Sequence, residues 1–232
     1  MNVLFDCDGT LVDSERLAFN AFQRVARDAL AIELTPEMWI EDFLGFTRAH
    51  CLERLALHFG SPLPDDLPQM IISTLRPMLD AQLSAIPGAE ETLPQIALPK
   101  FIVSNASVGH IEFVLGKARL TEHFSSFHSP TAGKARPKPA PDVYLNAVAD
   151  LGLTPAECIA VEDSVPGVQA AVAAGLTVIA FASQVPRHRL QTEGAHYVVE
   201  NFGEIARVIK QICDARTQSA TPPPRPVLAG EV

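Results

Sequence analysis

The chain has 232 residues, and an apolar fraction of 47% with 19% charged residues is typical of a globular protein large enough to bury a substantial core. Acidic residues outnumber basic ones by 27 to 18. The resulting net charge of −9 disfavours general nucleic-acid binding, because that function needs a basic face. No stretch approaches the ~18–20 consecutive apolar residues of a membrane helix, and no signal-peptide pattern opens the sequence.

Cysteine usage points to a reducing compartment. The four cysteines are Cys7, Cys51, Cys158 and Cys213, and they form neither a Cys-x-x-Cys pair nor a spacing typical of zinc sites. Scattered cysteines of this kind are expected to stay reduced. We therefore expect a cytoplasmic protein with no nucleic-acid or membrane partner. Because no long apolar stripe is left unassigned, we expect a monomer.

The first predicted element is a short buried strand, because the apolar run Val3–Phe5 ends abruptly at an acidic residue. Asp6 and Asp8 follow it, and residues i and i+2 of an extended chain point the same way, so both carboxylates can face one cleft. Gly9 lets the backbone turn sharply at this point. Two carboxylates so close repel each other unless a cation lies between them, which predicts a Mg²⁺ site; a polar turn after the strand is the alternative.

Residues 15–85 form a block without a convincing strand, in which apolar residues recur at helical spacing. The predicted helices cover about 14–30, 36–45, 47–60 and 65–83. Thr35 and Thr47 are suited to cap the second and third of these helices, and Pro77 is expected to kink or split the fourth. We interpret the block as a small helical lobe inserted after the first strand.

Beyond this block, buried strands alternate with helices. Strands are predicted at about 100–105, 124–128, 158–161 and 177–181, with a possible edge strand at 196–199. Helices are predicted at about 88–96, 111–118, 142–151, 165–174 and 203–215. Strands separated by helices pair in parallel with right-handed crossovers, so we expect an α/β fold with a doubly wound parallel sheet. The predicted domains are a core of 1–14 and 86–215, the lobe of 15–85, and a mobile tail of 216–232.

Polar side chains follow three of the predicted parallel strands, at the sheet edge where such folds bind ligands. They are Asp6 and Asp8, Ser104 and Asn105, and Glu162 and Asp163. A proline-rich loop contributes the basic residues Lys134, Arg136 and Lys138. Carboxylates, a hydroxyl and a lysine around room for a metal ion suit phosphoryl transfer, in which catalysis depends mainly on positioning and charge neutralisation.

Four stretches, in the right order between residues 3 and 181, resemble the motifs of the haloacid dehalogenase superfamily. They are Asp6-Cys7-Asp8-Gly9-Thr10, Ser104-Asn105, Lys138-Pro139-Ala140-Pro141-Asp142, and Glu162-Asp163-Ser164 followed by Gly167. The first and fourth are each fairly specific, and their joint occurrence with Lys138 between them is a strong signal. The resemblance implies a Rossmann-like catalytic core, and it implies that the inserted helical lobe is the cap that closes over the active site.

The resemblance supports a role for each motif residue. Asp6 is expected to be the nucleophile that forms an aspartyl-phosphate, and Asp8 the general acid and then the general base. Mg²⁺ is expected to bind the carboxylates of Asp6 and Asp163 and the backbone carbonyl of Asp8. Ser104 is expected to bind a phosphate oxygen, and Lys138 to neutralise the transferring group. The remaining candidates are Glu162, as a partner of Lys138 or of a metal-bound water, and Gly9, Thr10, Asn105 and Arg48 for phosphate or substrate.

Asp8 favours a phosphate ester as substrate, because family members that displace halide from carbon lack this second aspartate. The lobe is most similar to that of the β-phosphoglucomutase and sugar-phosphatase branch, where an arginine matching Arg48 grips the far end of the substrate. The mutases carry a histidine that restrains the second aspartate, and Ala18 stands at that position here. We therefore predict a phosphatase for a sugar phosphate or sugar-acid phosphate. A phosphosugar mutase is the alternative, and a non-catalytic binding protein is a weaker one.

Several other residues have no predicted role in the site. Three histidines on predicted helices are expected to be surface or partly packed residues: His50, His58 and His110. Asp13 and Glu15 are expected to be solvated. The side chain of Cys7 should point to the opposite face from the two aspartates that flank it.

Overall fold

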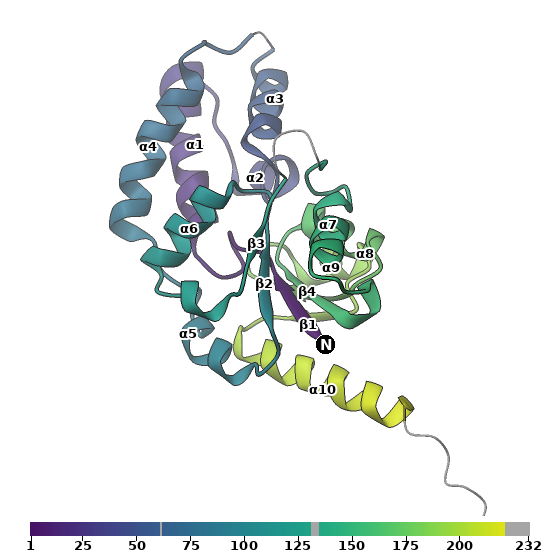
Figure 1. The fold of residues 1–232 in the computed structure, drawn as a ribbon. Helices are drawn as coiled ribbons and strands as arrows, with labels where there is room; N and C mark the ends of the chain where they lie inside the picture. The colour runs from purple at the N-terminus through teal and green to yellow at the C-terminus, as the bar shows by residue number, and fades with distance from the viewer. Residues whose placement is uncertain (61, 131–134, 221–232) are drawn as a thin grey trace, which may run out of the picture.

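The computed structural model describes residues 1–60, 62–130 and 135–220, and these form a six-stranded parallel sheet with helices on both faces (Figure 1). The strand order is β3-β2-β1-β4-β5-β6. The strands span Asn2–Phe5 (β1), Lys100–Val103 (β2), Phe127–His128 (β3), Cys158–Glu162 (β4), Thr177–Phe181 (β5) and Tyr197–Val199 (β6). Every adjacent pair is parallel, so the predicted α/β fold with a doubly wound parallel sheet is confirmed.

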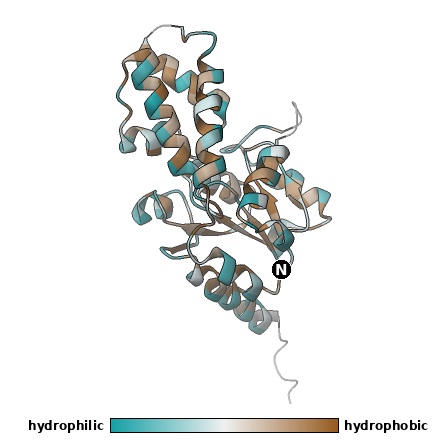
Figure 2. Ribbon diagram, turned by 90° about the vertical axis from the view of Figure 1, so that its left-hand side faces the viewer, coloured by the Kyte–Doolittle hydropathy of each residue, from teal (hydrophilic) through white to brown (hydrophobic). Residues whose placement is uncertain are grey.

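The helices cover both faces of the sheet, because successive strand residues point to opposite sides. Leu4 belongs to one buried cluster with residues of α7, α8 and α9, whereas Val3 and Phe5 belong to another with residues of α5, α6 and α10. These helices span Ala89–Thr92 (α5), Val108–Lys117 (α6), Asp142–Asp150 (α7), Val165–Ala173 (α8), Arg187–Thr192 (α9) and Gly203–Ala220 (α10). Figure 2 shows the strands as a hydrophobic layer between them.

Two helical segments differ from the sequence expectation. Helix α9 was not predicted, because its single buried residue, Leu190, gives no helical periodicity. Helix α10 continues to Ala220 instead of ending near residue 215. The rest of the expected tail, 221–232, lies outside the described residues. Among the helices of the described ranges, none combines the length and the apolar composition needed to cross a membrane.

Helices α1–α4 form the helical lobe, defined here as residues 14–82, between the first two strands (Figure 1). They span Ser14–Leu30 (α1), Pro36–Asp42 (α2), Arg48–Phe59 (α3) and Leu67–Gln82 (α4). As predicted, Thr35 caps α2 by accepting a hydrogen bond from the N–H of Met38 (3.2 Å). Thr47 caps α3 in the same way through the N–H of His50 (3.3 Å).

The two connections between the lobe and the sheet run side by side. The N–H of Asp13 donates to the carbonyl of Ser84 (3.0 Å), and the N–H of Ile86 donates to the carbonyl of Leu11 (2.8 Å). The segment that enters the lobe is therefore hydrogen-bonded to the segment that leaves it, directly after the carboxyl end of β1. This pairing holds the lobe next to the sheet edge that carries the acidic residues.

Pro77 lies inside α4, yet α4 is one helix over Leu67–Gln82 and is not split. A proline has no N–H for the carbonyl of the residue four positions earlier, which here is Ser73. Both Ser73 and Pro77 are exposed, so water can bond the carbonyl that the proline leaves unpaired. The exposed position explains why the helix continues.

Replacing Pro77 with alanine is expected to raise the free energy of unfolding by about 1–3 kcal/mol, because proline is about 3 kcal/mol less favourable than alanine inside a helix. Urea denaturation followed by circular dichroism measures the change. Ser73→Ala, on the same exposed face, is the control and should stay within about 0.5 kcal/mol of the wild type. A Pro77→Ala variant no more stable than the wild type would contradict the explanation.

Candidate active site

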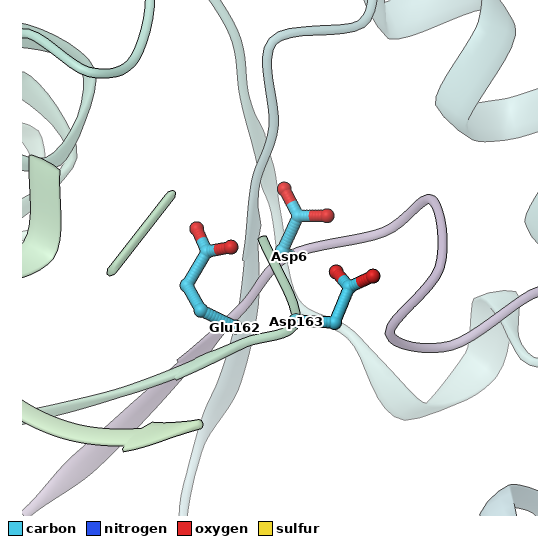
Figure 3. A group of neighbouring side chains, drawn as sticks. All are labelled: Asp6, Glu162 and Asp163. Carbon is cyan, nitrogen blue, oxygen red and sulfur yellow. The ribbon is translucent and has the colours of Figure 1, made fainter. Parts of the chain in front are cut away.

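The carboxyl ends of β1 and β4 bring three acidic side chains together. The N–H of Asp6 donates to the carbonyl of Val161 (2.9 Å), so the β1–β4 ladder fixes the backbone of Asp6. One carboxylate oxygen from each of Asp6, Glu162 and Asp163 lies within 4.8 Å of the others, and all three residues are buried (Figure 3). The expected convergence of strand ends is therefore present in the fold.

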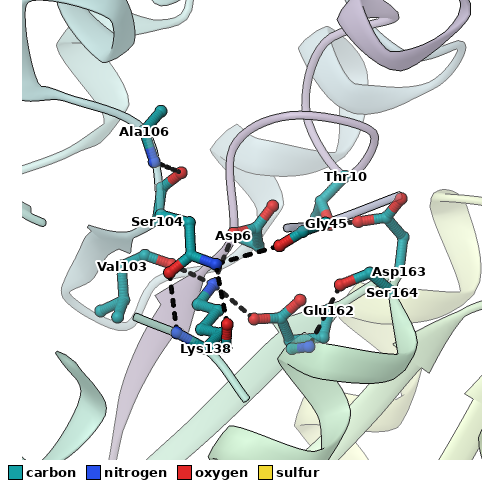
Figure 4. Close-up of polar contacts among 12 residues, drawn as sticks. Asp6, Thr10, Gly45, Val103, Ser104, Ala106, Lys138, Glu162, Asp163 and Ser164 are labelled. Carbon is teal, nitrogen blue, oxygen red and sulfur yellow. Dashed lines mark hydrogen bonds and ion pairs between the residues drawn. The ribbon is translucent and has the colours of Figure 1, made fainter. Parts of the chain in front are cut away.

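Lys138 is buried against this acidic group. Its side chain is 2% exposed, and its Nζ donates to Asp6 Oδ1 (2.5 Å), Glu162 Oε1 (2.6 Å) and the Val103 carbonyl (2.7 Å) (Figure 4). Burial alone would lower the pKa of Lys138, but the two carboxylates raise it above its ordinary value. The lysine therefore stays charged and neutralises the carboxylates that it contacts.

The acidic group fits a divalent metal ion. Two buried carboxylate oxygens, Glu162 Oε2 and Asp163 Oδ2, have no hydrogen-bond partner within the described ranges. Burial raises the pKa of Asp6 to about 8 despite Lys138, and burial and neighbouring carboxylates raise the pKa of Asp163 well above its ordinary value. A cation held by hard oxygen ligands would partner the free oxygen of Asp163 and offset this repulsion.

The turn after β1 and the first turn of α8 pack closely against the same carboxylates. A Cβ atom at Gly9, where φ is +79°, would overlap Asp163 Oδ2, and one at Gly167 would overlap the Glu162 carboxylate. Thr10 is fully buried, and its hydroxyl donates to Asp163 Oδ1 (2.9 Å). The N–H of Gly9 bonds a carbonyl within its own turn. The Thr10 hydroxyl and the Gly9 N–H thus already have hydrogen-bond partners within the protein, and the expectation that Gly9 and Thr10 bind phosphate or substrate stays a prediction.

Asp8 is held by two side chains that the motif analysis did not assign. Asp8 Oδ1 accepts hydrogen bonds from Ser14 Oγ (2.5 Å) and His110 Nε2 (2.9 Å). Burial alone would raise the pKa of Asp8, but His110 and Ser14 lower it below its ordinary value. Asp8 in turn raises the pKa of His110. His110 is partly packed, as expected, but its contact with the candidate general acid was missed.

Ser104 and Asn105, which follow β2, differ in how far the protein uses their polar atoms. Ser104 Oγ lines the cavity and accepts a hydrogen bond from the N–H of Ala106 (3.1 Å), which leaves its hydroxyl proton for a ligand. Asn105 Nδ2 donates to the carbonyls of Gly45 (3.0 Å) and Lys138 (3.2 Å). Asn105 Oδ1 accepts from the N–H of Lys138 (2.8 Å). Asn105 therefore ties the lobe to the loop of Lys138.

A cavity of about 540 Å³ lies between the strand ends and the helical lobe. Its polar wall includes Asp6, Asp8, Ser104 and His110, whereas much of the lobe wall is apolar and includes Trp39, Phe46, Leu52, Ile72 and Leu75. Arg48 is exposed at this cavity and forms no ion pair with any described residue. Glu15 also lines the cavity, and burial and nearby Asp8 raise its pKa to about 8, so it is not the simply solvated residue expected.

The basic loop places one of its three predicted cations at the acidic group. Arg136 is exposed and forms a two-pronged ion pair with Asp142, with Nε 2.9 Å from Oδ1 and Nη2 2.8 Å from Oδ2. Lys134 lies outside the described residues. The charge that this loop brings to the acidic group, as far as the structure describes the loop, is that of Lys138.

Comparisons with known proteins agree with this fold. The chain is 30% identical over 182 residues to 6-phosphogluconate phosphatase of Escherichia coli, covering 78% of this chain and 82% of that protein. It is 27% identical over 198 residues to β-phosphoglucomutase of Bacillus subtilis, covering 79% and 84%. A crystal structure of a haloacid dehalogenase-like protein from Agrobacterium tumefaciens superposes with a TM-score of 0.79 at 32% identity, covering 91% and 98%.

The similarity to proteins named as phosphatases supports the expectation that this chain is an enzyme of that kind. Family membership rests on a broader match. Residues 3–181, the span that holds all four motifs, fit the model of the haloacid dehalogenase-like hydrolases. The resemblance drawn from those motifs is therefore confirmed, and this chain belongs to the haloacid dehalogenase-like hydrolases.

Proposed function

We propose that this protein is a Mg²⁺-dependent phosphatase that hydrolyses a small phosphorylated metabolite through an aspartyl-phosphate intermediate. The observation that carries the proposal is the position of Asp6 in the cavity wall, with Lys138 Nζ at 2.5 Å and Asp163 beside it. An anionic carboxylate can attack an anionic phosphate ester only where positive charge offsets their repulsion. The buried lysine supplies such charge at the nucleophile itself.

Residues of the cavity, together with the buried Lys138, would carry out both steps of the reaction. In the first step Asp6 forms a bond to phosphorus while the bond from phosphorus to the alcohol oxygen breaks. The alcohol oxygen keeps the electron pair of the broken bond and receives a proton from Asp8. In the second step the oxygen of a water molecule forms a bond to phosphorus while the bond from phosphorus to Asp6 breaks, and Asp8 accepts a proton from that water. Phosphate is released, and the Asp6 carboxylate is restored. Lys138 offsets the charge on the transferring group, and the Ser104 hydroxyl donates to a phosphate oxygen.

The residues that would hold Mg²⁺ are Asp6 and Asp163, through their carboxylates, and Asp8, through its backbone carbonyl. When bound, the ion supplies positive charge that polarises the phosphoryl oxygens. Glu162 is proposed to orient Lys138 instead, because its Oε1 accepts hydrogen bonds from both Lys138 and the Tyr144 hydroxyl (2.5 Å).

The proposed substrate is a sugar phosphate or a sugar-acid phosphate. Arg48 is exposed at the lobe side of the cavity, where it can bind hydroxyls or a carboxylate at the far end of such a substrate. One relative is named as a phosphatase of 6-phosphogluconate, which is a sugar-acid phosphate. We also propose that the lobe acts as the cap over this cavity.

A cytoplasmic monomer is proposed as the working form. All four cysteines are free, and three of them are buried. Reduced, unpaired cysteines are typical of proteins in reducing compartments. The net charge of −9 further supports small-molecule chemistry without a nucleic-acid partner.

A phosphosugar mutase is the alternative, and one observation favours it. Ala18 stands where mutases carry a restraining histidine, so on the sequence alone that restraint is missing. In the fold, His110 supplies a histidine to Asp8 from another element, so that reasoning is incomplete. One relative is a β-phosphoglucomutase. With β-glucose 1-phosphate and a trace of the 1,6-bisphosphate, a mutase yields glucose 6-phosphate, whereas a phosphatase yields free phosphate.

The proposal is tested by measuring phosphate release from sugar, sugar-acid, nucleotide and polyol phosphates, each with Mg²⁺ and with EDTA. We expect release that depends on Mg²⁺ and is strongest for a sugar phosphate or sugar-acid phosphate. Asp163→Asn should need at least about tenfold more Mg²⁺ for half-maximal rate, because it loses a charged ligand. Activity that is unchanged in EDTA would rule out the metal, and no release from any ester would favour a non-catalytic binding protein.

A further inference from the structure

His110 contacts the candidate general acid although it lies outside all four motifs. We infer that His110, together with Ser14, is a positioning residue that holds Asp8 in the orientation from which it transfers protons. The inference rests on the proposed function, because the phosphoryl-transfer reaction is what gives Asp8 a proton to deliver. It concerns the orientation of the carboxyl group of Asp8 and adds no new catalytic group.

Both hydrogen bonds to the Asp8 carboxylate reach the same oxygen atom. Asp8 Oδ1 accepts from His110 Nε2 at 2.9 Å and from Ser14 Oγ at 2.5 Å. No hydrogen bond from the part of the chain that the structure describes reaches Asp8 Oδ2. The Asp8 side chain is 19% exposed and lines the cavity. One oxygen is therefore fixed by the protein, and the other is left for substrate and water.

The two donors lie at the starts of two helices, α6 and α1. His110 lies in the first turn of α6, where its N–H donates to the carbonyl (2.9 Å) and the hydroxyl (3.3 Å) of Ser107. The next residue, Ile111, is fully buried, so this turn cannot shift without disturbing the core. Ser14 is the first residue of α1 and is buried. The positions of both donors are thus set by packing that does not involve substrate.

The place of His110 argues against a purely packing role. Its side chain is 32% exposed and lines the cavity, so water could satisfy both ring nitrogens. Its Nε2 nevertheless bonds the carboxylate of Asp8, which lies 102 positions away in the sequence. A hydrogen bond to a charged acceptor is shorter and stronger than a neutral one, and it restricts the rotation of the acceptor.

With Oδ1 fixed, Oδ2 is the oxygen that exchanges protons. In the first step the proton on Oδ2 moves to the alcohol oxygen as the bond from phosphorus to that oxygen breaks. In the second step Oδ2 takes a proton from the water that attacks the aspartyl-phosphate, so the carboxyl group is restored. Proton transfer of this kind contributes about 10²–10⁴-fold in rate, and it requires the acid within hydrogen-bond reach of the leaving oxygen. Loss of His110 should therefore lower the rate most for substrates whose leaving group needs a proton.

Two esters of similar size separate this role from a folding defect. Benzyl phosphate has a leaving group that needs a proton, whereas the p-nitrophenolate of p-nitrophenyl phosphate leaves without one. The measured quantity is kcat/KM, which reports the steps up to the release of the alcohol. We expect His110→Ala to lower kcat/KM for benzyl phosphate about 10–100-fold and that for p-nitrophenyl phosphate less than about threefold.

Conservative and control variants complete the test. His110→Gln keeps an N–H donor and should stay within about fivefold of the wild type on benzyl phosphate. Ser14→Ala removes the other donor and should show the same dependence on the ester as His110→Ala. His188→Ala, which removes an exposed histidine of α9, should leave both esters unchanged.

The outcomes also separate the inference from the proposed function. A His110→Ala variant that is folded by circular dichroism and loses activity equally on both esters, or on neither, would overturn the positioning role, as would a His110→Gln variant as slow as His110→Ala. If the wild type releases phosphate from neither ester and from none of the metabolites above, the proposed function itself fails. If His110→Ala is poorly folded, both rates fall together, and the ester ratio of Ser14→Ala then decides: a ratio equal to that of the wild type would overturn the positioning role.

Discussion

Replacing Asp6 with asparagine is expected to lower phosphate release by about 10⁴-fold or more, because the variant cannot form the aspartyl-phosphate. The fold should be kept. Lys138 retains two acceptors, Glu162 Oε1 and the Val103 carbonyl, when the Asp6 carboxylate is lost. The change also removes one of three carboxylates that repel one another, so the metal-free variant should be no less stable than the wild type.

The measurement for Asp6→Asn combines phosphate release with mass spectrometry of acid-quenched reactions. The wild type should show one phosphoryl group on the peptide that contains Asp6, and the variant should show none. Asp13→Asn is the matched control, since Asp13 lies in the same segment but pairs with Arg16 at the surface (2.7 Å). Activity of Asp6→Asn within tenfold of the wild type would exclude Asp6 as the nucleophile.

The grouping of Asp6, Lys138 and Asp163 could be predicted because it depends on simple rules. Short apolar runs that end in acidic residues mark the ends of buried parallel strands, and those ends meet at one edge of the sheet. Cys7 shows the same logic on the other face: its side chain packs in the core cluster with Val3 and Phe5, as the alternation along a strand requires.

The contacts of His110, Tyr144 and Glu15 could not be predicted in the same way. Each depends on how a helix turns and tilts against the sheet, and periodicity along the sequence does not contain that information. From the sequence, Tyr144 is expected to be an ordinary core residue of α7, yet in the fold its hydroxyl donates to Glu162. One signal was available for His110. His110 is a polar residue in the first turn of the helix that follows β2, and β2 carries a motif. Such a helix starts at the same sheet edge as the motif, so its first polar residues lie near the site.

Asn105 has contacts within the protein that its place in a motif did not predict. Its position at the end of β2 suggested contact with substrate. In the fold its amide bonds Gly45 of the lobe and both backbone polar groups of Lys138. Such bridging contacts join segments that are distant in sequence, so they emerge only when the lobe and the loop are placed together.

Replacing Lys138 with methionine is expected to lower the free energy of unfolding by about 3–5 kcal/mol and to abolish phosphate release. The variant fills a similar volume but leaves Asp6 and Glu162 as buried carboxylates without their counter-charge, which is the costly way to break a buried ion pair. Lys100→Met is the matched control. Lys100 Nζ also donates to backbone carbonyls, those of Ile96 and Leu98, but it contacts no carboxylate among the described residues, so its loss should be much milder.

The stability deficit of Lys138→Met should also grow with pH in metal-free buffer. Burial raises the pKa of Asp6 from 3.8 to about 8, and Lys138 opposes that rise, so without the lysine the folded-state pKa of Asp6 moves higher still. Above the unfolded-state pKa, the folded variant then binds more protons than the unfolded chain, and the free energy of unfolding falls as pH rises. Wild-type Asp6 also stays protonated up to its folded-state pKa of about 8, so the two proteins diverge only above that pH. Urea denaturation at about pH 6 and about pH 10 should therefore give the larger difference from the wild type at the higher pH. A deficit that is equal at both pH values would show that Lys138 is not the counter-charge of Asp6.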